Sequence, residues 1–209
     1  MNNLLLSNIL DVTTIFVCLF TTVRVGMVYP YVRSPRLLTL GISMGILTIV
    51  AIADLIDSNL ITIATGSDWF IYSGQIAAFL CILLSITSTS DAYLSGLIRF
   101  QVFACVILLC LLLSTFALPD VTDQRLHTLL GSPRFLLCAG ISFYYLVGFI
   151  KKQTRFSLLM SASFLLLVVG YLLDVQQHIV PLYAELLDAL GDVSRLLGFL
   201  SLLAAVLGN

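Results

Sequence analysis

Four ionisable residues lie close together near the end of the chain, at spacings of three, four and three residues. They are Glu185, Asp188, Asp192 and Arg195. Because successive residues of an α-helix are turned by about 100°, these spacings place all four within about a 90° arc of one helix face. Their neighbours are almost all Leu, Ala, Val, Phe and Gly. Charged side chains on an apolar helix are costly inside a membrane and mark ion, proton or ligand sites, so this stripe is the first functional candidate.

Asp192 and Arg195 lie deepest in that predicted helix. Counted from Pro181 at about 1.5 Å per residue, they lie about 16 Å and about 21 Å along it. Near the centre of a membrane, each charge would cost roughly 3 kcal/mol or more without a partner. At i, i+3 the two side chains can pair with each other. The sequence therefore predicts an Asp192–Arg195 ion pair that faces protein rather than lipid.

Arg24 is the second expected partner of this pair. It lies about 22 Å from Ile9 along the first apolar segment, at a depth similar to that of Arg195. If the first and last helices of a seven-helix ring are neighbours, Arg24, Asp192 and Arg195 form one buried cluster. Two interpretations stay open: an ion-pair clamp between two helices, or a site for a proton, an ion or a small ligand.

A second group of carboxylates is expected at one level near the outer ends of the helices. Asp54 lies three residues before Asp57 on one predicted helix, and Asp174 shares a face with Tyr171 on another. Several carboxylates at one level could bind a proton or a cation, and ordinary solvated helix ends are the alternative. The candidate ligand or ion residues are therefore Arg24, Asp54, Asp174, Asp188, Asp192 and Arg195.

Motifs of known catalytic and cofactor chemistry are missing from the sequence. It contains no Ser-His-Asp nucleophile motif, phosphate-binding loop, Gly-rich dinucleotide turn or H-E-x-x-H. The two histidines, His127 and His178, are both expected near the outer surface, which does not suit a buried haem. The five cysteines lie inside apolar segments without a C-x-x-C pair. We therefore expect no cofactor, no metal site and no enzymatic activity.

Composition identifies the class of protein that must position these residues. The chain has 209 residues, of which 60% are hydrophobic and 10% charged, whereas soluble domains average about 25% charged residues. Continuous apolar runs of about 20 residues favour helical spans over a β-barrel. The net charge of −1 excludes a basic nucleic-acid binder. Met1 to Asn8 contain no basic residue, so the first span is not expected to be a cleaved signal peptide.

The apolar runs predict an all-α integral membrane bundle of seven transmembrane helices, in a single domain. The predicted spans are about 9–32, 36–57, 69–90, 95–118, 133–150, 156–174 and 181–207. The longest predicted loop, about 119–132, could hold a short amphipathic helix. No internal repeat is evident in the sequence.

The distribution of basic residues predicts how the spans are oriented. Six Lys and Arg residues fall in the loops on one side, namely Arg33, Arg36, Arg99, Lys151, Lys152 and Arg155. The loops on the other side hold only Arg125 and Arg134. Since basic residues accumulate in cytoplasmic loops, we expect the N-terminus outside and the C-terminus inside. We expect a multi-pass protein located in the plasma (inner) membrane.

This topology resembles that of microbial rhodopsins and of the seven-helix input modules of bacterial sensors. Retinal proteins attach the chromophore to a lysine of the last span, whereas the only lysines here are Lys151 and Lys152, in a predicted loop. A covalent retinal is therefore excluded.

No soluble output domain is expected, so the protein would act through a partner. The expected partners are the lipid bilayer and either another membrane protein or further copies of the chain. No nucleic acid is expected to bind. We expect a non-enzymatic receptor-like or accessory subunit of a membrane complex. The alternative is a proton or small-cation transporter or channel that uses the outer carboxylates and Asp192.

Overall fold

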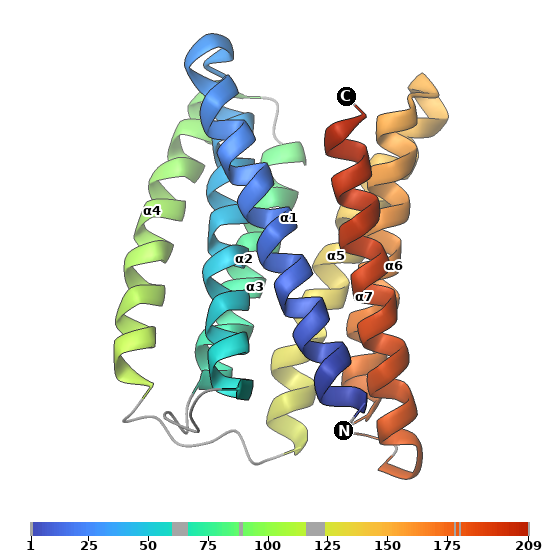
Figure 1. Ribbon diagram of the computed structural model, residues 1–209. Helices are drawn as coiled ribbons and strands as arrows, with labels where there is room; N and C mark the ends of the chain where they lie inside the picture. Colours follow the sequence, from blue (N-terminus) through green and yellow to red (C-terminus); the bar gives the residue numbers. More distant parts are fainter. Residues whose placement is uncertain are drawn as a thin grey trace. The chain divides into compact units, whose positions relative to one another are not determined.

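The helices predicted from the apolar runs are present in the structure, a computed structural model that describes residues 2–59, 67–87, 90–115, 124–177, 179 and 181–208. Within these residues the chain is all-helical, without strands, and seven helices are long and apolar enough to cross a membrane (Figure 1). They are α1 (Asn2–Val32), α2 (Pro35–Asn59), α3 (Ser67–Thr87), α4 (Asp91–Ser114), α5 (Gln124–Lys152), α6 (Arg155–Gln177) and α7 (Ala184–Leu207). A 3₁₀ turn, η1 (Pro181–Tyr183), precedes α7. Seven helices of this length and composition indicate a multi-pass membrane protein.

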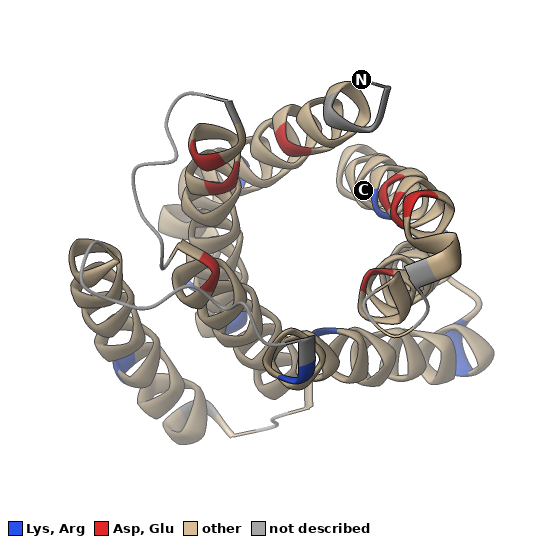
Figure 2. Cartoon of the chain, turned by 90° about the horizontal axis from the view of Figure 1, so that it is seen from below, with Lys and Arg blue, Asp and Glu red and all other residues tan. Residues whose placement is uncertain are grey.

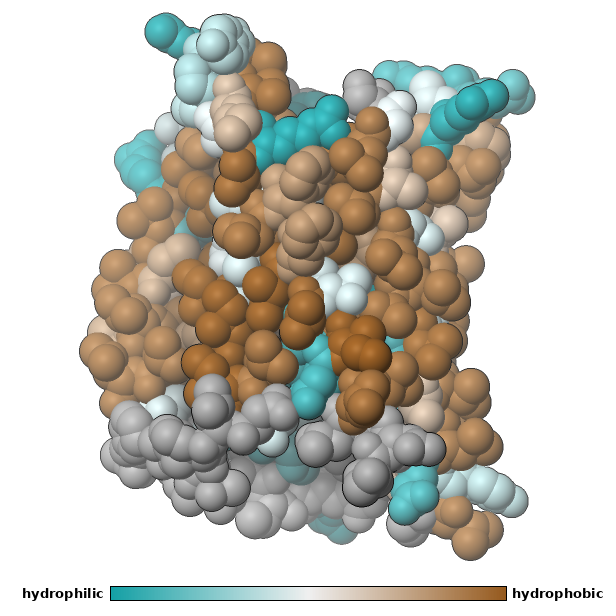
Figure 3. Space-filling view, viewed as in Figure 1, coloured by the Kyte–Doolittle hydropathy of each residue, from teal (hydrophilic) through white to brown (hydrophobic). Residues whose placement is uncertain are grey.

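The helix surfaces carry the pattern that lipid contact requires. On the face shown in Figure 3, hydrophobic side chains cover most of the described surface. The exposed residues of α4, for example, include Phe103, Val106 and Leu113, all more than half exposed. Charged residues are sparse along the helices (Figure 2). A surface of this kind is stable in hydrocarbon and would aggregate in water.

The chain divides into two compact units. The central unit comprises Cys18–Val121 and contains the second half of α1 together with α2, α3 and α4. The terminal unit comprises Met1–Val17 and Thr122–Asn209, and contains α5, α6 and α7.

Close helix contacts at small residues hold the central unit together. α2 packs against both α3 and α4, and α3 packs against α4. A Cβ atom on Gly74 of α3 would lie 2.4 Å from Val50 Cγ2 of α2, so only glycine permits this approach. Gln101 of α4 is fully buried and donates to Ser43 Oγ of α2 at 2.8 Å. Small residues at contacts and hydrogen bonds between helices are the usual means of helix association in membranes.

In the terminal unit, α6 packs against both α5 and α7. Ser142 Oγ of α5 donates to the Ser161 carbonyl of α6 at 2.9 Å, and Ser161 Oγ donates back to the Ser142 carbonyl at 3.2 Å. On the other side of α6, Ser163 Oγ donates to the Gly198 carbonyl of α7 at 2.8 Å. These three hydroxyls find backbone acceptors on the neighbouring helix, so none of them needs to face lipid.

The largest difference from the predicted boundaries is at α5. The sequence indicated a span beginning at Pro133, after a loop, but the described helix begins at Gln124 and contains Pro133 in its interior. A proline inside a helix removes one backbone hydrogen bond. Packing against α6 offsets this loss, because Gly131 lies so close to Val175 that a Cβ on it would be 2.8 Å from Val175 Cγ2. The part of the predicted loop before residue 124 lies outside the described residues.

Candidate functional site

Arg134 of α5 forms the first ion pair of the terminal unit. Its Nη2 donates to Asp174 Oδ2 of α6 at 2.7 Å, and the two side chains are only 4% and 13% exposed. Gln177, one turn further along α6, donates from Nε2 to the other carboxylate oxygen of Asp174 at 2.9 Å. Both oxygens of this carboxylate therefore accept a hydrogen bond, which offsets part of the free energy of burying its charge.

Asp192 and Arg195 of α7 form the second ion pair. Arg195 Nη2 donates to Asp192 Oδ1, and Asp192 is buried. This confirms the pair predicted from their i, i+3 spacing. Burial increases along the stripe from Glu185, which is exposed, through Asp188, which is half-buried, to Asp192, which is buried, but Arg195 is again half-buried.

Tyr171 of α6 joins the two pairs into one cluster. Its ring is buried, and the guanidinium carbons of Arg134 and Arg195 lie 4.9 Å and 5.7 Å from the ring centroid. Both distances lie within the range of cation–π attraction, which is stronger for desolvated cations. We call Arg134, Tyr171, Asp174, Asp192 and Arg195 the charged cluster; its members come from three helices of one unit.

Glycines create the space for this cluster between α6 and α7. A Cβ on Gly170 would lie 2.4 Å from Arg195 Cγ and 2.9 Å from the Gly191 carbonyl oxygen. The stem of Arg195 therefore passes over a position on α6 where only a hydrogen atom fits. The same close approach lets Ser194 Oγ donate to the Leu166 carbonyl of α6 at 2.7 Å. Small residues on both helices thus hold the arginine in place.

The electrostatics of the charged cluster are nearly balanced. Its two guanidinium groups face two carboxylates, and the carboxylates of Asp174 and Asp188 also repel the negative charge of Asp192. In a low-dielectric interior such pairs are strongly coupled, because removing one member leaves an uncompensated buried charge. Chemically, the cluster can hold three helices in one arrangement, or exchange one of its internal partners for a ligand of the same charge.

Of the six candidate residues from the sequence, Asp174, Asp192 and Arg195 belong to the charged cluster. Asp188 lies near it on α7. Arg24 and Asp54 belong to the central unit, so the cluster predicted between Arg24 and the last helix stays a prediction.

Arg134 was missed as a site residue, because it follows Pro133 and was counted among loop residues. The available signal was an apolar helical pattern that continues through the proline. His178, expected near the outer surface from the sequence, lies outside the described residues.

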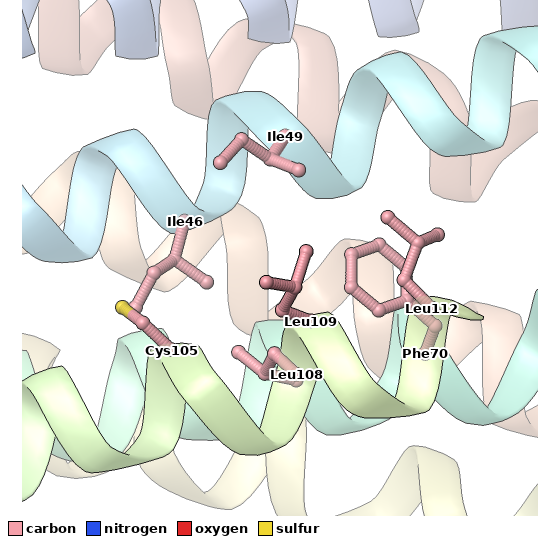
Figure 4. A pocket seen from close by; sticks show the side chains of 7 residues that line it. All are labelled: Ile46, Ile49, Phe70, Cys105, Leu108, Leu109 and Leu112. Atoms are coloured by element: carbon pink, nitrogen blue, oxygen red, sulfur yellow. The ribbon is translucent and has the colours of Figure 1, made fainter. Parts of the chain in front are cut away.

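An apolar cavity of about 210 Å³ lies in the central unit (Figure 4). Ile46 and Ile49 of α2, Phe70 of α3, and Cys105 and Leu108 of α4 line it. It is larger than the roughly 150 Å³ cavity that suffices to bind benzene, but it contains no charged side chain that would fix an orientation. Among the described residues, no group of three or more His, Cys, Asp and Glu side chains is placed to hold a metal ion.

Comparisons with known proteins give no family for this chain: no protein-family model, curated protein or solved structure matches it. The geometry of the charged cluster therefore carries the functional argument.

Proposed function

We propose that the protein is a non-enzymatic membrane protein that acts through a partner, as a receptor-like or accessory subunit of a membrane complex. The observation that supports this most is the closure of the charged cluster. Asp174 and Asp192 are both buried or nearly so, and each is bound by a guanidinium of its own unit. A general acid, base or nucleophile must instead be able to reach a substrate.

A closed charged cluster suits a protein that transmits a movement between helices or stabilises a larger complex. The Arg134–Asp174 pair ties α5 to α6, and the contact of Tyr171 with Arg195 ties α6 to α7. A partner that moves one of these helices would then move the other two, because separating α5 from α6 breaks a buried ion pair and separating α6 from α7 breaks the cation–π contact of Arg195. The same closure disfavours ion conduction, because a cation would have to displace Arg195 before it reached Asp192.

The mass of the protein in its own membrane tests this proposal. The chain would be extracted at its natural level into polymer-bounded lipid discs and weighed by native mass spectrometry. One copy has a mass of 22.9 kDa. We expect a particle heavier than one copy, with a mass that corresponds to a fixed number of partner subunits or of further copies of this chain. A different seven-helix protein with the same tag, extracted from the same membranes, controls for chance co-extraction. A chain that is always monomeric would contradict the proposal.

The second candidate is a proton or small-cation transporter or channel. It is favoured by the proximity of Asp174 and Asp188 to Asp192, which places three carboxylates in one unit. Purified protein in liposomes would be assayed for proton, sodium and potassium flux, with Asp192→Asn as the variant. Flux in the wild type that is lost in Asp192→Asn supports transport. No wild-type flux, or equal flux in both, removes this candidate.

A further inference from the structure

Two helix-to-helix turns far apart in the sequence have the same geometry. α1 and α5 both end in front of a residue with φ of 48°, Arg33 and Gln153. Each of these residues donates its N–H to the carbonyl four residues earlier, at 2.8 Å from Arg33 and 2.7 Å from Gln153. After each turn, Leu38 and Leu158 donate to the carbonyl four residues earlier, both at 3.2 Å. In both pairs the equivalent residues are 120 positions apart.

The helices that flank these turns continue the same correspondence. α1 ends at Val32 and α5 at Lys152, α2 begins at Pro35 and α6 at Arg155, and α3 ends at Thr87 and α7 at Leu207. Each of these three pairs of boundaries is again 120 positions apart.

The contacts between the helices correspond as well. Thr22 Oγ1 of α1 lies 2.8 Å from the Cys18 carbonyl of its own helix and 3.3 Å from the Gly41 carbonyl of α2, so its single proton is shared between these two acceptors. Ser142 Oγ of α5 donates to the Ser161 carbonyl of α6 at 2.9 Å. Thr22 and Ser142, like Gly41 and Ser161, are separated by the same 120 positions. The two hairpins therefore share their turn, their register and a hydrogen bond between helices.

Burial and residue type follow the same offset. Five chemically informative residues are identical in the two segments: Cys18 and Cys138, Ser43 and Ser163, Asp54 and Asp174, Asp68 and Asp188, and Phe79 and Phe199. In each of these pairs both members fall in the same burial class, buried for the cysteines, serines and phenylalanines, and half-buried for the aspartates. Identical residues are too few elsewhere in the segments for a repeat to be evident in the sequence alone.

The two segments differ at the charged cluster. The positions of Asp192 and Arg195 correspond to Tyr72 and Gln75 in α3, and that of Tyr171 corresponds to Ala51 in α2. On α1, Thr14 stands at the register position of Arg134. Tyr72 and Gln75 carry no charge, so this pair of positions contains no ion pair in the first segment. Yet α2 and α3 pack closely there, as the contact of Gly74 with Val50 shows.

We propose that the chain is an internal duplication of one three-helix unit, with α1–α3 as first copy, α5–α7 as second copy and α4 as the connector. The Asp192–Arg195 pair is then a functional addition to a fold that the first copy forms without it. An element needed only for folding would be expected in both copies. Parallel repeats of this kind are known among membrane proteins, and a connector of a single helix gives both copies the same orientation in the membrane.

The orientation of the two equivalent turns tests the duplication. Ser34→Cys and Thr154→Cys, one in each turn, would be reacted in sealed vesicles with a maleimide that does not cross membranes, with the wild type as the background. Both positions should react from the same side of the membrane. Reaction of the two positions from opposite sides would overturn the duplication.

The stability of two variants tests the role of the ion pair. Arg195→Gln alone leaves Asp192 charged and buried, whereas Asp192→Asn with Arg195→Gln removes both charges. In lipid discs, we expect the single variant to unfold about 10 °C below the wild type and the double variant within about 3 °C of it. Leu197→Ala, at an exposed position of α7, controls for any substitution on this helix. A double variant that unfolds with the single variant, or below it, contradicts the proposal, and two variants as stable as the wild type support it.

The functional part of the inference rests on the proposed function. The folded double variant should retain less than a tenth of the partner that the wild type holds in the mass measurement. Full retention would show that the pair is not the functional addition. If the wild type itself has no partner, the proposed function fails, while the turn labelling still tests the duplication and the stability of the two variants still tests whether folding needs the ion pair.

Discussion

Gly170→Ala is the substitution for which the structure gives the sharpest expectation. The new Cβ would lie 2.4 Å from Arg195 Cγ, 2.9 Å from the Gly191 carbonyl oxygen and 3.1 Å from the Arg195 amide nitrogen. The first clash could be relieved by moving the arginine side chain, at the expense of its contacts with Asp192 and Tyr171. The second cannot, because the oxygen belongs to the backbone of α7. The two helices would have to separate.

The size of the effect follows from two opposing terms. Inserting one methyl group into a closely packed contact typically destabilises by about 1–3 kcal/mol. Replacing glycine by alanine inside a helix is itself favourable by roughly 0.5–1 kcal/mol. The midpoints of these two ranges give a net loss of about 1 kcal/mol, which for a chain of this length lowers Tm by roughly 2–4 °C.

Thermal unfolding in lipid discs, followed by the reaction of buried thiols with a fluorogenic maleimide, would measure this loss. Cys18 and Cys138 are fully buried in the folded protein and become reactive on unfolding. Gly26→Ala is the matched control, because a Cβ on Gly26 meets no atom within 4 Å. It should raise Tm slightly. If Gly170→Ala were as stable as Gly26→Ala, the close approach of α6 and α7, and with it the placement of Arg195, would be refuted.

Substitutions at three further contacts, those of Arg134, Ser142 and Gln101, are tested by the same thermal assay. Arg134→Met should destabilise the protein by about 3–5 kcal/mol, because it leaves Asp174 charged and buried. The double variant Arg134→Met with Asp174→Leu should recover most of this lost stability. A double variant no more stable than the single variant would contradict the coupling between the two side chains. Ser142→Ala should cost only about 0.6 kcal/mol, the typical value for one hydrogen bond between membrane helices, and a loss above 2 kcal/mol would mean that the contact with Ser161 does more than hydrogen bonding. Gln101→Leu should stay within about 1 kcal/mol of the wild type, because it removes two hydrogen bonds together with the buried Oε1, which accepts none. Gln101→Ala should cost about 2 kcal/mol or more, because it leaves a cavity. Equal losses of stability in the two variants would show that packing around Gln101 is unimportant.

Local properties of the chain determined the secondary structure and the first ion pair. Seven apolar runs of about 20 residues predict seven helices, because only a helix satisfies all backbone polar groups within one apolar segment. The Asp192–Arg195 pair was predictable for a related reason. Residues at i, i+3 meet on any helix, whatever surrounds it.

Contacts between segments decided the rest, since they depend on which helix faces which. Arg134 and Asp174 are 40 positions apart, and no spacing rule joins them. Pro133 suggested the start of a helix, but α5 begins at Gln124 and packs against Val175 of α6 at Gly131, before the proline. The 120-residue correspondence was hidden for the same reason. Many apolar residues fit lipid and neighbouring helices equally well, so the two copies share backbone geometry and burial while most of their side chains differ.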